Sequence, residues 1–327
     1  MKRILTGLKP SGELTLGSFI GGIKGTIERQ EEYESFLFVP DMHAITVRQD
    51  PKLLKERIRK NVALYLACGV DPDKNIIYLQ SENLYHANLS WVLECNTYMG
   101  EASRMTQYKD KSSKGENVTV GLFTYPILMA SDILLYDADY VPVGIDQKQH
   151  VELARNIAER FNKIYGDTFK IPEPLIPEVG AKIMDLQNPT KKMSKSDETY
   201  KGVILLLDDE KTIRKKIMSA ITDSENKVYY DLENKPGISN LLTIYSSLKE
   251  ISIKDAEEHF KEYNYGNLKK EVADVVVEVL TNIQTKYNKL INSTEIDNIL
   301  DKGKEITNKI AKEKQEEVFS KVGLGRY

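Results

Sequence analysis

The sequence predicts an α/β protein, a doubly wound parallel sheet followed by an α-helical C-terminal region. Strand-like and helix-like segments alternate through the first half of the chain, as they do when helices join parallel strands. Ser35–Val39 is a nearly continuous apolar segment, which is typical of a strand buried on both faces. From about Asp208 the strand-like segments give way to charged helical patterns. We therefore expect the sheet first and helices after it.

Local signals place the individual elements. Strands are expected at residues 3–7, 35–39, 75–80 and 140–144. Asp50 can cap a helix that Pro51 starts and Gly69 ends, and other helical patterns cover residues 121–136, 146–165, 211–222, 267–290 and 294–322. The proline-spaced residues 171–177 are expected to be a connector. Parallel sheets bind ligands beyond the carboxyl ends of their strands, so residues 7–12, 41–43 and 144–147 should share one crevice.

Composition excludes several classes of protein. The 327 residues are 41% hydrophobic and 29% charged, and no stretch approaches the roughly 20 apolar residues of a membrane span. The amino-terminal segment lacks the apolar stretch of a secretory signal, so we expect a cytoplasmic protein. A net charge of −3 argues against nonspecific coating of nucleic acid. Cys68 and Cys95 are expected to be reduced thiols of the core.

Two segments carry residues that suit a nucleotide. Pro10–Gly12 and Gly17–Ser18, at the start of a helix, would offer close backbone, free amides and the positive end of a helix dipole, although a tight structural turn explains these glycines equally well. Lys192 and Lys195 flank Ser194 and could follow a triphosphate as its charge builds, whereas lysine-rich loops are often only solvated. The common phosphate-loop, dinucleotide, zinc-protease and serine-hydrolase motifs are missing from the sequence.

A carboxylate inside an apolar helical stripe marks a second candidate site. Tyr125, Met129 and Asp132 have helical spacing and should lie on one face. Burying Asp132 is costly unless it has a donor, and a flat aromatic ligand with one N–H, held between Met129, Val141 and Val143, would supply one. His43, just past a buried strand, is placed to meet a ligand.

The other three histidines have no such placement. We interpret His86, His150 and His259 as structural, because a lone histidine in an apolar segment usually has that role.

Taken together, these blocks resemble the bacterial-type tryptophanyl-tRNA synthetases, a family of class I aminoacyl-tRNA synthetases. The matching blocks are residues 10–12 with 15–18 (the HIGH-type motif), 41–46, 104–107, 125–136, 141–144 with 146–150, and 192–196 (the KMSKS motif). They occur in the family's order, and the resemblance extends from the first strand to Arg326. The chain departs from the family pattern at Lys9, Ser18 and Ile145, all in the expected ATP site.

The resemblance implies a Rossmann-like catalytic domain and assigns the site residues. ATP would be held by Lys9, Pro10, Ser11, Gly17, Ser18, Gly144, Ile145, Asp146, Ile183, Lys192, Met193, Ser194, Lys195 and Ser196. Tryptophan would be held by Asp132, Tyr125, Met129, Gln147, His43, Val141 and Val143, with Asp132 accepting the indole N–H. Lys111, Lys192 and Lys195 would steady the phosphates while the tryptophan carboxylate attacks the α-phosphorus.

The resemblance also implies the reaction and the partners. The enzyme would form tryptophanyl-adenylate and pyrophosphate from ATP, with Mg²⁺ bound to ATP rather than to protein side chains, and would then charge tRNA(Trp). It would be a cytoplasmic homodimer with no membrane or DNA partner. Residues 1–200 would form the catalytic domain with the KMSKS loop, and residues 201–327 an anticodon-recognition region whose last helix packs back on the first domain.

Three alternatives stay open on the sequence. The sister tyrosyl enzymes share the fold but bind a phenol. A small-molecule adenylyltransferase would use the same sheet without RNA, although the helical region after Asp208 would then have no obvious task. An inactive RNA-binding relative would keep the fold without the reaction. Aminoacylation of RNA would exclude both the adenylyltransferase and the inactive relative.

Overall fold

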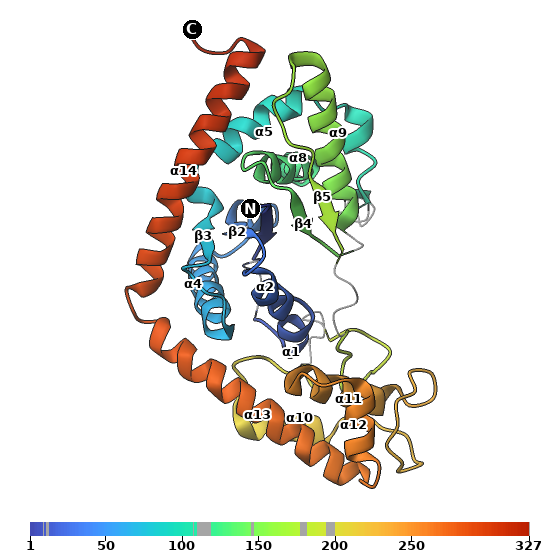
Figure 1. Ribbon diagram of the computed structural model, residues 1–327. Helices are drawn as coiled ribbons and strands as arrows, with labels where there is room; N and C mark the ends of the chain where they lie inside the picture. The colour runs from blue at the N-terminus through green and yellow to red at the C-terminus, as the bar shows by residue number, and fades with distance from the viewer. Residues whose placement is uncertain are drawn as a thin grey trace.

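The sheet has the predicted doubly wound topology. The computed structural model describes residues 1–8, 10, 13–106, 108–109, 119–144, 147–176, 182–193 and 200–326. In them the strands are β1 (Arg3–Gly7), β2 (Glu34–Val39), β3 (Asn75–Leu79), β4 (Tyr140–Pro142) and β5 (Glu173–Leu175). They pair in parallel in the order β3-β2-β1-β4-β5 (Figure 1). The winding direction changes between β1 and β4, which is where such sheets bind ligands.

Helices cover the sheet and then form the C-terminal region. The first set is α1 (Leu16–Ser18), the π-helix η1 (Phe19–Ile23), α2 (Lys24–Arg29), α3 (Asp41–Ala44), α4 (Pro51–Cys68), the 3₁₀ helix η2 (Gln80–Glu82), α5 (Tyr85–Cys95), α6 (Met99–Ala102), α8 (Val120–Leu134) and α9 (Lys148–Tyr165). The second set is α10 (Glu210–Met218), α11 (Pro236–Lys249), α12 (Ile253–Phe260), α13 (Tyr265–Leu290) and α14 (Glu295–Val322). The predicted caps of α4 are confirmed: the Asp50 side chain accepts from two backbone amides, and Gly69 ends the helix with a φ of 115°.

Two details of the sequence prediction are wrong. Residues 173–175 are not a connector but the edge strand β5, in which Pro174 pairs with Val141. An edge strand tolerates proline because one of its sides has no neighbouring strand to bond. Cys95, expected in the core, is exposed at the end of α5, and both cysteines are free thiols.

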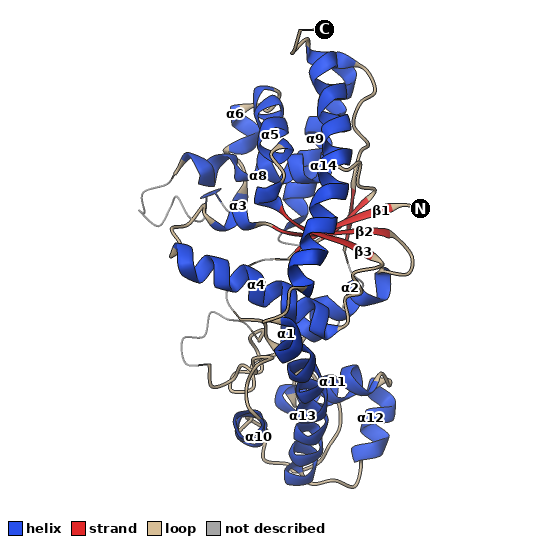
Figure 2. Cartoon of the chain, turned by 90° about the vertical axis from the view of Figure 1, so that its left-hand side faces the viewer, coloured by secondary structure: helices blue, strands red, loops and turns tan. Residues whose placement is uncertain are grey.

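The last helix lies against the edge of the sheet. A Cβ atom at Gly303 would stand 1.9 Å from the carbonyl oxygen of Ile77 in β3, so the backbone of α14 touches the strand where only glycine fits. Thr307 and Ala311 of α14 are fully buried, and α14 runs along the molecule past β3 and α5 (Figures 1 and 2). The C-terminal helix therefore contributes to the core of the catalytic half.

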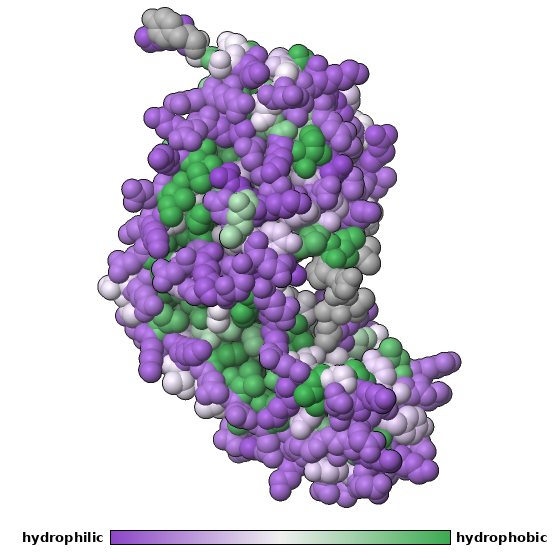
Figure 3. Space-filling model, viewed as in Figure 1, coloured by the Kyte–Doolittle hydropathy of each residue, from purple (hydrophilic) through white to green (hydrophobic). Residues whose placement is uncertain are grey.

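One hydrophobic core joins the two halves of the chain. Leu16 and Phe19, from the helix after β1, belong to the same buried cluster as Leu241 of α11 and Val272 of α13. The visible face in Figure 3 is mostly hydrophilic, and its hydrophobic side chains form several separate patches. The helical region is thus packed on the helix that leads out of β1.

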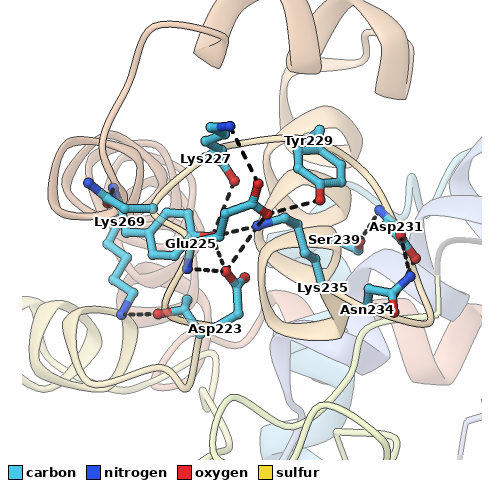
Figure 4. Close-up of polar contacts among 12 residues, drawn as sticks. Asp223, Glu225, Lys227, Tyr229, Asp231, Asn234, Lys235, Ser239 and Lys269 are labelled. Carbon is cyan, nitrogen blue, oxygen red and sulfur yellow. Dashed lines mark hydrogen bonds and ion pairs between the residues drawn. The ribbon is translucent and has the colours of Figure 1, made fainter.

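A lysine organises the loop between α10 and α11. The Lys235 side chain is 2% exposed, and its amine lies 3.0 Å from Asp223, 2.8 Å from Glu225 and 2.9 Å from the Tyr265 hydroxyl (Figure 4). Its amine also stands 4.5 Å from the centre of the Tyr229 ring. Neighbouring acidic groups raise the Lys235 pKa although burial opposes this, so the charged amine holds the loop to α13.

Candidate active site

A cavity of about 490 Å³ opens at the carboxyl ends of β1 and β4. The seven side chains expected around tryptophan all line it: His43, Tyr125, Met129, Asp132, Val141, Val143 and Gln147. Gly7, Pro10 and Gly144 line it too, so the described parts of the three predicted segments do share one crevice. Leu5 and Ile133 add apolar wall. The cavity is mainly apolar with few polar groups, as small-molecule sites usually are.

Asp132 is the buried polar centre of this cavity. Its side chain is fully buried, and three donors reach it: His43 Nε2 at 2.7 Å from Oδ2, and Gln80 Nε2 and His86 Nδ1, each 2.7 Å from Oδ1. Burial by itself would raise the pKa of Asp132, but the charge and hydrogen bond of His43, and then those of His86, lower it to about 2. The carboxylate is therefore ionised at neutral pH and acts only as an acceptor.

The helix α8 presents the ligand-facing side chains at regular spacing. Tyr125, Met129 and Asp132 lie on its cavity side, as the sequence predicts. The Tyr125 hydroxyl lies 2.9 Å from His150 Nε2, and burial raises the Tyr125 pKa to about 12, so the phenol stays neutral. His150 therefore orients a cavity residue rather than only filling the core. His259, by contrast, bonds Glu271 in the helical region, in line with a structural role.

Gln80 and His86 were not predicted as site residues. The interpretation of His86 as purely structural is incomplete, because it bonds the central carboxylate of the cavity. Both residues follow the carboxyl end of β3, the same position relative to the sheet that singled out His43 after β2. Applying that rule to every strand would have found Gln80, which follows β3 directly, whereas His86 lies within α5.

Two of the nucleotide candidates, Ser18 and Gly144, line a second cavity of about 820 Å³, which shares Gly7, Val143 and Gly144 with the first. Gly17 packs on the KMSKS segment: a Cβ atom there would lie 3.3 Å from Met193 and 3.6 Å from Ile183.

The segments that carry these residues are tied together. The Met193 amide donates to the Ile183 carbonyl at 2.9 Å, and both side chains are buried. Lys192 is exposed. Gly17, Ile183 and Met193 thus lie together, whereas Ser18 lines the second cavity and Pro10 the first.

The expectation of free amides at the helix start is partly wrong. The Ser18 amide donates to Thr15 Oγ1 at 3.0 Å, and the Leu16 amide donates to the Ile204 carbonyl at 2.9 Å. Threonine at this position caps its own helix, a preference that holds without any ligand. The other predicted residues, Lys9, Ser11, Lys111, Ile145, Asp146, Ser194, Lys195 and Ser196, lie outside the described residues.

Comparison with known proteins settles the family. The family model described as tRNA synthetases class I (W and Y) matches residues 1–281. The chain belongs to this family. It is 52% identical over 326 residues to the tryptophan–tRNA ligase of Bacillus anthracis, covering 100% of this chain and 99% of that one. It is 53% identical over 323 residues to the Bacillus subtilis tryptophan–tRNA ligase, with 99% and 98% covered.

Solved structures of the family share the fold. The tryptophanyl-tRNA synthetase of Mycoplasma pneumoniae superposes with a TM-score of 0.88 at 38% identity, covering 99% of this chain and 98% of that one. The Campylobacter jejuni enzyme, complexed with ADP and tryptophan, superposes with a TM-score of 0.86 at 37% identity, covering 98% and 100%. In the ranges that the structure describes, every helix is too short or too polar to cross a membrane.

Proposed function

We propose that the chain is a tryptophan–tRNA ligase, which activates L-tryptophan with ATP to tryptophanyl-adenylate and pyrophosphate and then transfers tryptophan to tRNA(Trp). The single observation that carries the proposal is the fully buried, ionised Asp132 at the wall of an apolar cavity. Relatives at about half identity over the whole chain bear the same name.

The hydrogen bonds of Asp132 leave room for one further donor. An ionised carboxylate offers about four lone-pair sites. Gln80 and His86 take two on Oδ1, and His43 takes one on Oδ2. The remaining site, on Oδ2, suits one N–H, and indole has one. Met129, Val141 and Val143 would contact the ring faces, and Tyr125, Gln147 and His43 would orient the amino acid.

The neighbouring cavity is proposed to hold ATP. Pro10, Gly17, Ser18, Gly144, Ile183, Lys192 and Met193 would contact the nucleotide, together with Lys9, Ser11, Ile145, Asp146, Ser194, Lys195 and Ser196. Gly7, Val143 and Gly144 line both cavities, which suits a reaction in which the tryptophan carboxylate attacks the α-phosphorus of ATP. Lys111, Lys192 and Lys195 would stabilise the charge that leaves with pyrophosphate.

Mg²⁺ is proposed to arrive bound to ATP. Among the residues that the structure describes, no group of three His, Cys, Asp or Glu side chains could hold a metal ion. Oxygen atoms of phosphate and water are the ligands that Mg²⁺ prefers, so the triphosphate itself would supply them.

The test of activation is ATP–pyrophosphate exchange with each of the twenty amino acids, with and without Mg²⁺. We expect Mg²⁺-dependent exchange with tryptophan alone. Exchange with tyrosine would move the chain to the sister enzymes, because a carboxylate can accept from a phenol as well as from an indole. Exchange with no amino acid would refute the proposal.

The helical region is proposed to recognise the tRNA anticodon. Residues 1–200 would form the catalytic domain and residues 201–327 the anticodon-recognition region, with α14 reaching back to β3. Charging of tRNA(Trp) is the test, compared with the same tRNA carrying a changed anticodon. The anticodon change should lower kcat/KM for charging and leave exchange unchanged. Equal charging of both tRNAs would contradict the assignment.

An apolar groove supports a homodimer. Ile45, Trp91 and Val120 are 64%, 66% and 77% exposed. Ile45 directly follows α3, Trp91 lies on α5 and Val120 begins α8, and these helices gather on one side of the molecule (Figure 2). A groove of about 450 Å³ between these elements is lined by Ile45, Trp91 and Tyr125, and Tyr125 also lines the tryptophan cavity. Exposed apolar patches of this kind mark protein contacts, and this one borders the site.

Sedimentation measures whether the protein is a monomer or a dimer. Trp91→Glu should give monomers and weaken tryptophan activation, whereas Leu232→Glu, an equally exposed residue (66%) of the helical region, should leave the dimer intact. A monomeric wild-type chain, or a dimer that survives Trp91→Glu, would contradict the proposal. We also propose that the protein works in the cytoplasm, where its tRNA substrate is.

A further inference from the structure

A chain of buried hydrogen bonds runs from Asp132 away from the cavity. His86 Nδ1 bonds Asp132, and its Nε2 lies 2.9 Å from the Tyr136 hydroxyl. Asn83 Nδ2 donates to the same hydroxyl at 3.0 Å, while Asn83 Oδ1 accepts the backbone amide of Tyr85 at 3.0 Å. The four side chains are at most 1% exposed. These hydrogen bonds are therefore shielded from solvent.

The two ends of this chain have a fixed hydrogen-bond direction. Because Asn83 Oδ1 faces a backbone N–H, its Nδ2 must face Tyr136 and donate. The Tyr136 hydroxyl, which accepts this bond, lies 2.9 Å from His86 Nε2. Because the ionised Asp132 carboxylate can only accept, His86 Nδ1 carries a proton and donates it to Oδ1.

Packing holds the His86 ring in this orientation. The ring stacks near Phe38 and Tyr78, with centroids 6.3 Å and 6.0 Å away. Its backbone carbonyl accepts from the Ser131 hydroxyl at 2.7 Å, which ties the start of α5 to the residue beside Asp132. Gln80 is fixed in the same way, because its Oε1 accepts the Met42 amide at 3.2 Å. Both donors to Oδ1 are thus anchored by the backbone.

We propose that His86 is a positioning residue for tryptophan selection. It acts through Asp132: together with Gln80 it saturates Oδ1, so that the one free lone pair is on Oδ2, the oxygen that His43 also contacts. The inference rests on the proposed function, because it takes the indole N–H as the ligand of that lone pair. Without His86, Oδ1 has a free lone pair and the carboxylate can turn, so the acceptor no longer has a fixed place.

The test compares tryptophan with an analogue that lacks the N–H. In β-(benzothiophen-3-yl)-L-alanine, sulfur replaces the indole N–H while the shape is kept. KM for tryptophan and the inhibition constant of the analogue are measured in ATP–pyrophosphate exchange. In His86→Leu, tryptophan KM should rise about 10- to 100-fold, as expected for a hydrogen bond to a charged group, with the analogue and the KM for ATP nearly unchanged.

Conservative variants complete the design. In His86→Asn, the amide Nδ2 replaces Nδ1 as donor, and most of the preference for tryptophan over the analogue should return. Tyr136→Phe, which keeps His86 but removes its orienting hydroxyl, should lower that preference about 2- to 10-fold and serves if His86→Leu does not fold. A preference that stays unchanged, or an equal weakening of both ligands, overturns the positioning role. Absence of tryptophan exchange in the wild-type protein refutes the proposed function instead.

Discussion

Replacing Asp132 by asparagine separates the role of the carboxylate in binding from its role in folding. Gln80 and His86 can both donate to the amide oxygen if it takes the place of Oδ1. The amide NH₂ then takes the place of Oδ2, and His43 can accept from it by changing tautomer. The variant should therefore fold with nearly unchanged thermal stability.

Tryptophan activation should suffer strongly in this variant. The indole N–H loses a hydrogen bond to a charged group, worth about 1.5 to 3 kcal/mol, and the N–H left facing the amide donor costs about 1 to 3 kcal/mol more. A sum of about 2.5 to 6 kcal/mol corresponds to a loss of about 10²- to 10⁴-fold in kcat/KM for tryptophan.

Exchange kinetics with tryptophan and phenylalanine measure the effect, with KM for ATP as the internal control. Phenylalanine has no N–H to lose, so the preference for tryptophan over phenylalanine should collapse. A preference that survives Asp132→Asn, or a parallel loss of ATP affinity, would refute the reasoning.

Three further predictions concern stability. The Asp132 pKa is lowered to about 2 in the folded protein, so its ionised form stabilises the fold fully above an unfolded pKa of about 3.9 and loses this effect as pH falls towards 2. In urea unfolding, the free energy of unfolding of wild type minus that of Asp132→Asn should therefore be near zero and constant from about pH 8 to 5, and should fall by about 2 to 3 kcal/mol as pH drops from about 4 to 2. Lys235→Met should lower the free energy of unfolding by about 2 kcal/mol through lost bonds to Asp223 and Tyr265, whereas Lys227→Met, whose side chain is 74% exposed, should change it by less than about 0.5 kcal/mol. Gly303→Ala should cost at least about 2 kcal/mol in the same measurement, because its Cβ would meet the Ile77 carbonyl, whereas Gly100→Ala, with open space around it, should not destabilise.

The sequence predicted the sheet well because its signals are local. The apolar pattern of β2, the caps of α4 and the alternation of strands with helices each depend on a few neighbouring residues. The edge strand β5 was not predicted, because proline usually interrupts a strand. Pro174 is tolerated only because its strand lies at the edge of the sheet.

The site residues that lie at the carboxyl edge of the sheet could be predicted from the sequence. Asp132 and His43 meet as expected because α8 and the segment after β2 both reach the carboxyl edge of the sheet. His86 was not predicted as a site residue, because a histidine in an apolar helix usually belongs to the core. Only the tertiary fold brings its Nδ1 to Asp132. The Ser18 amide was expected to be free, and the Thr15 hydroxyl two residues before Gly17 was the overlooked signal.

The position of α14 makes protection of the β3 edge depend on a helix that is far from this strand in the sequence. The ribosome makes β1 first and α14 last, yet the carbonyl side of β3 at Ile77 is covered only when Gly303 and the buried face around Thr307 arrive. Until then a nascent chain carries every residue of the tryptophan cavity on a sheet whose edge is open to pairing with other strands. A chain that ends early would therefore keep its whole site and still lack a stable scaffold for it.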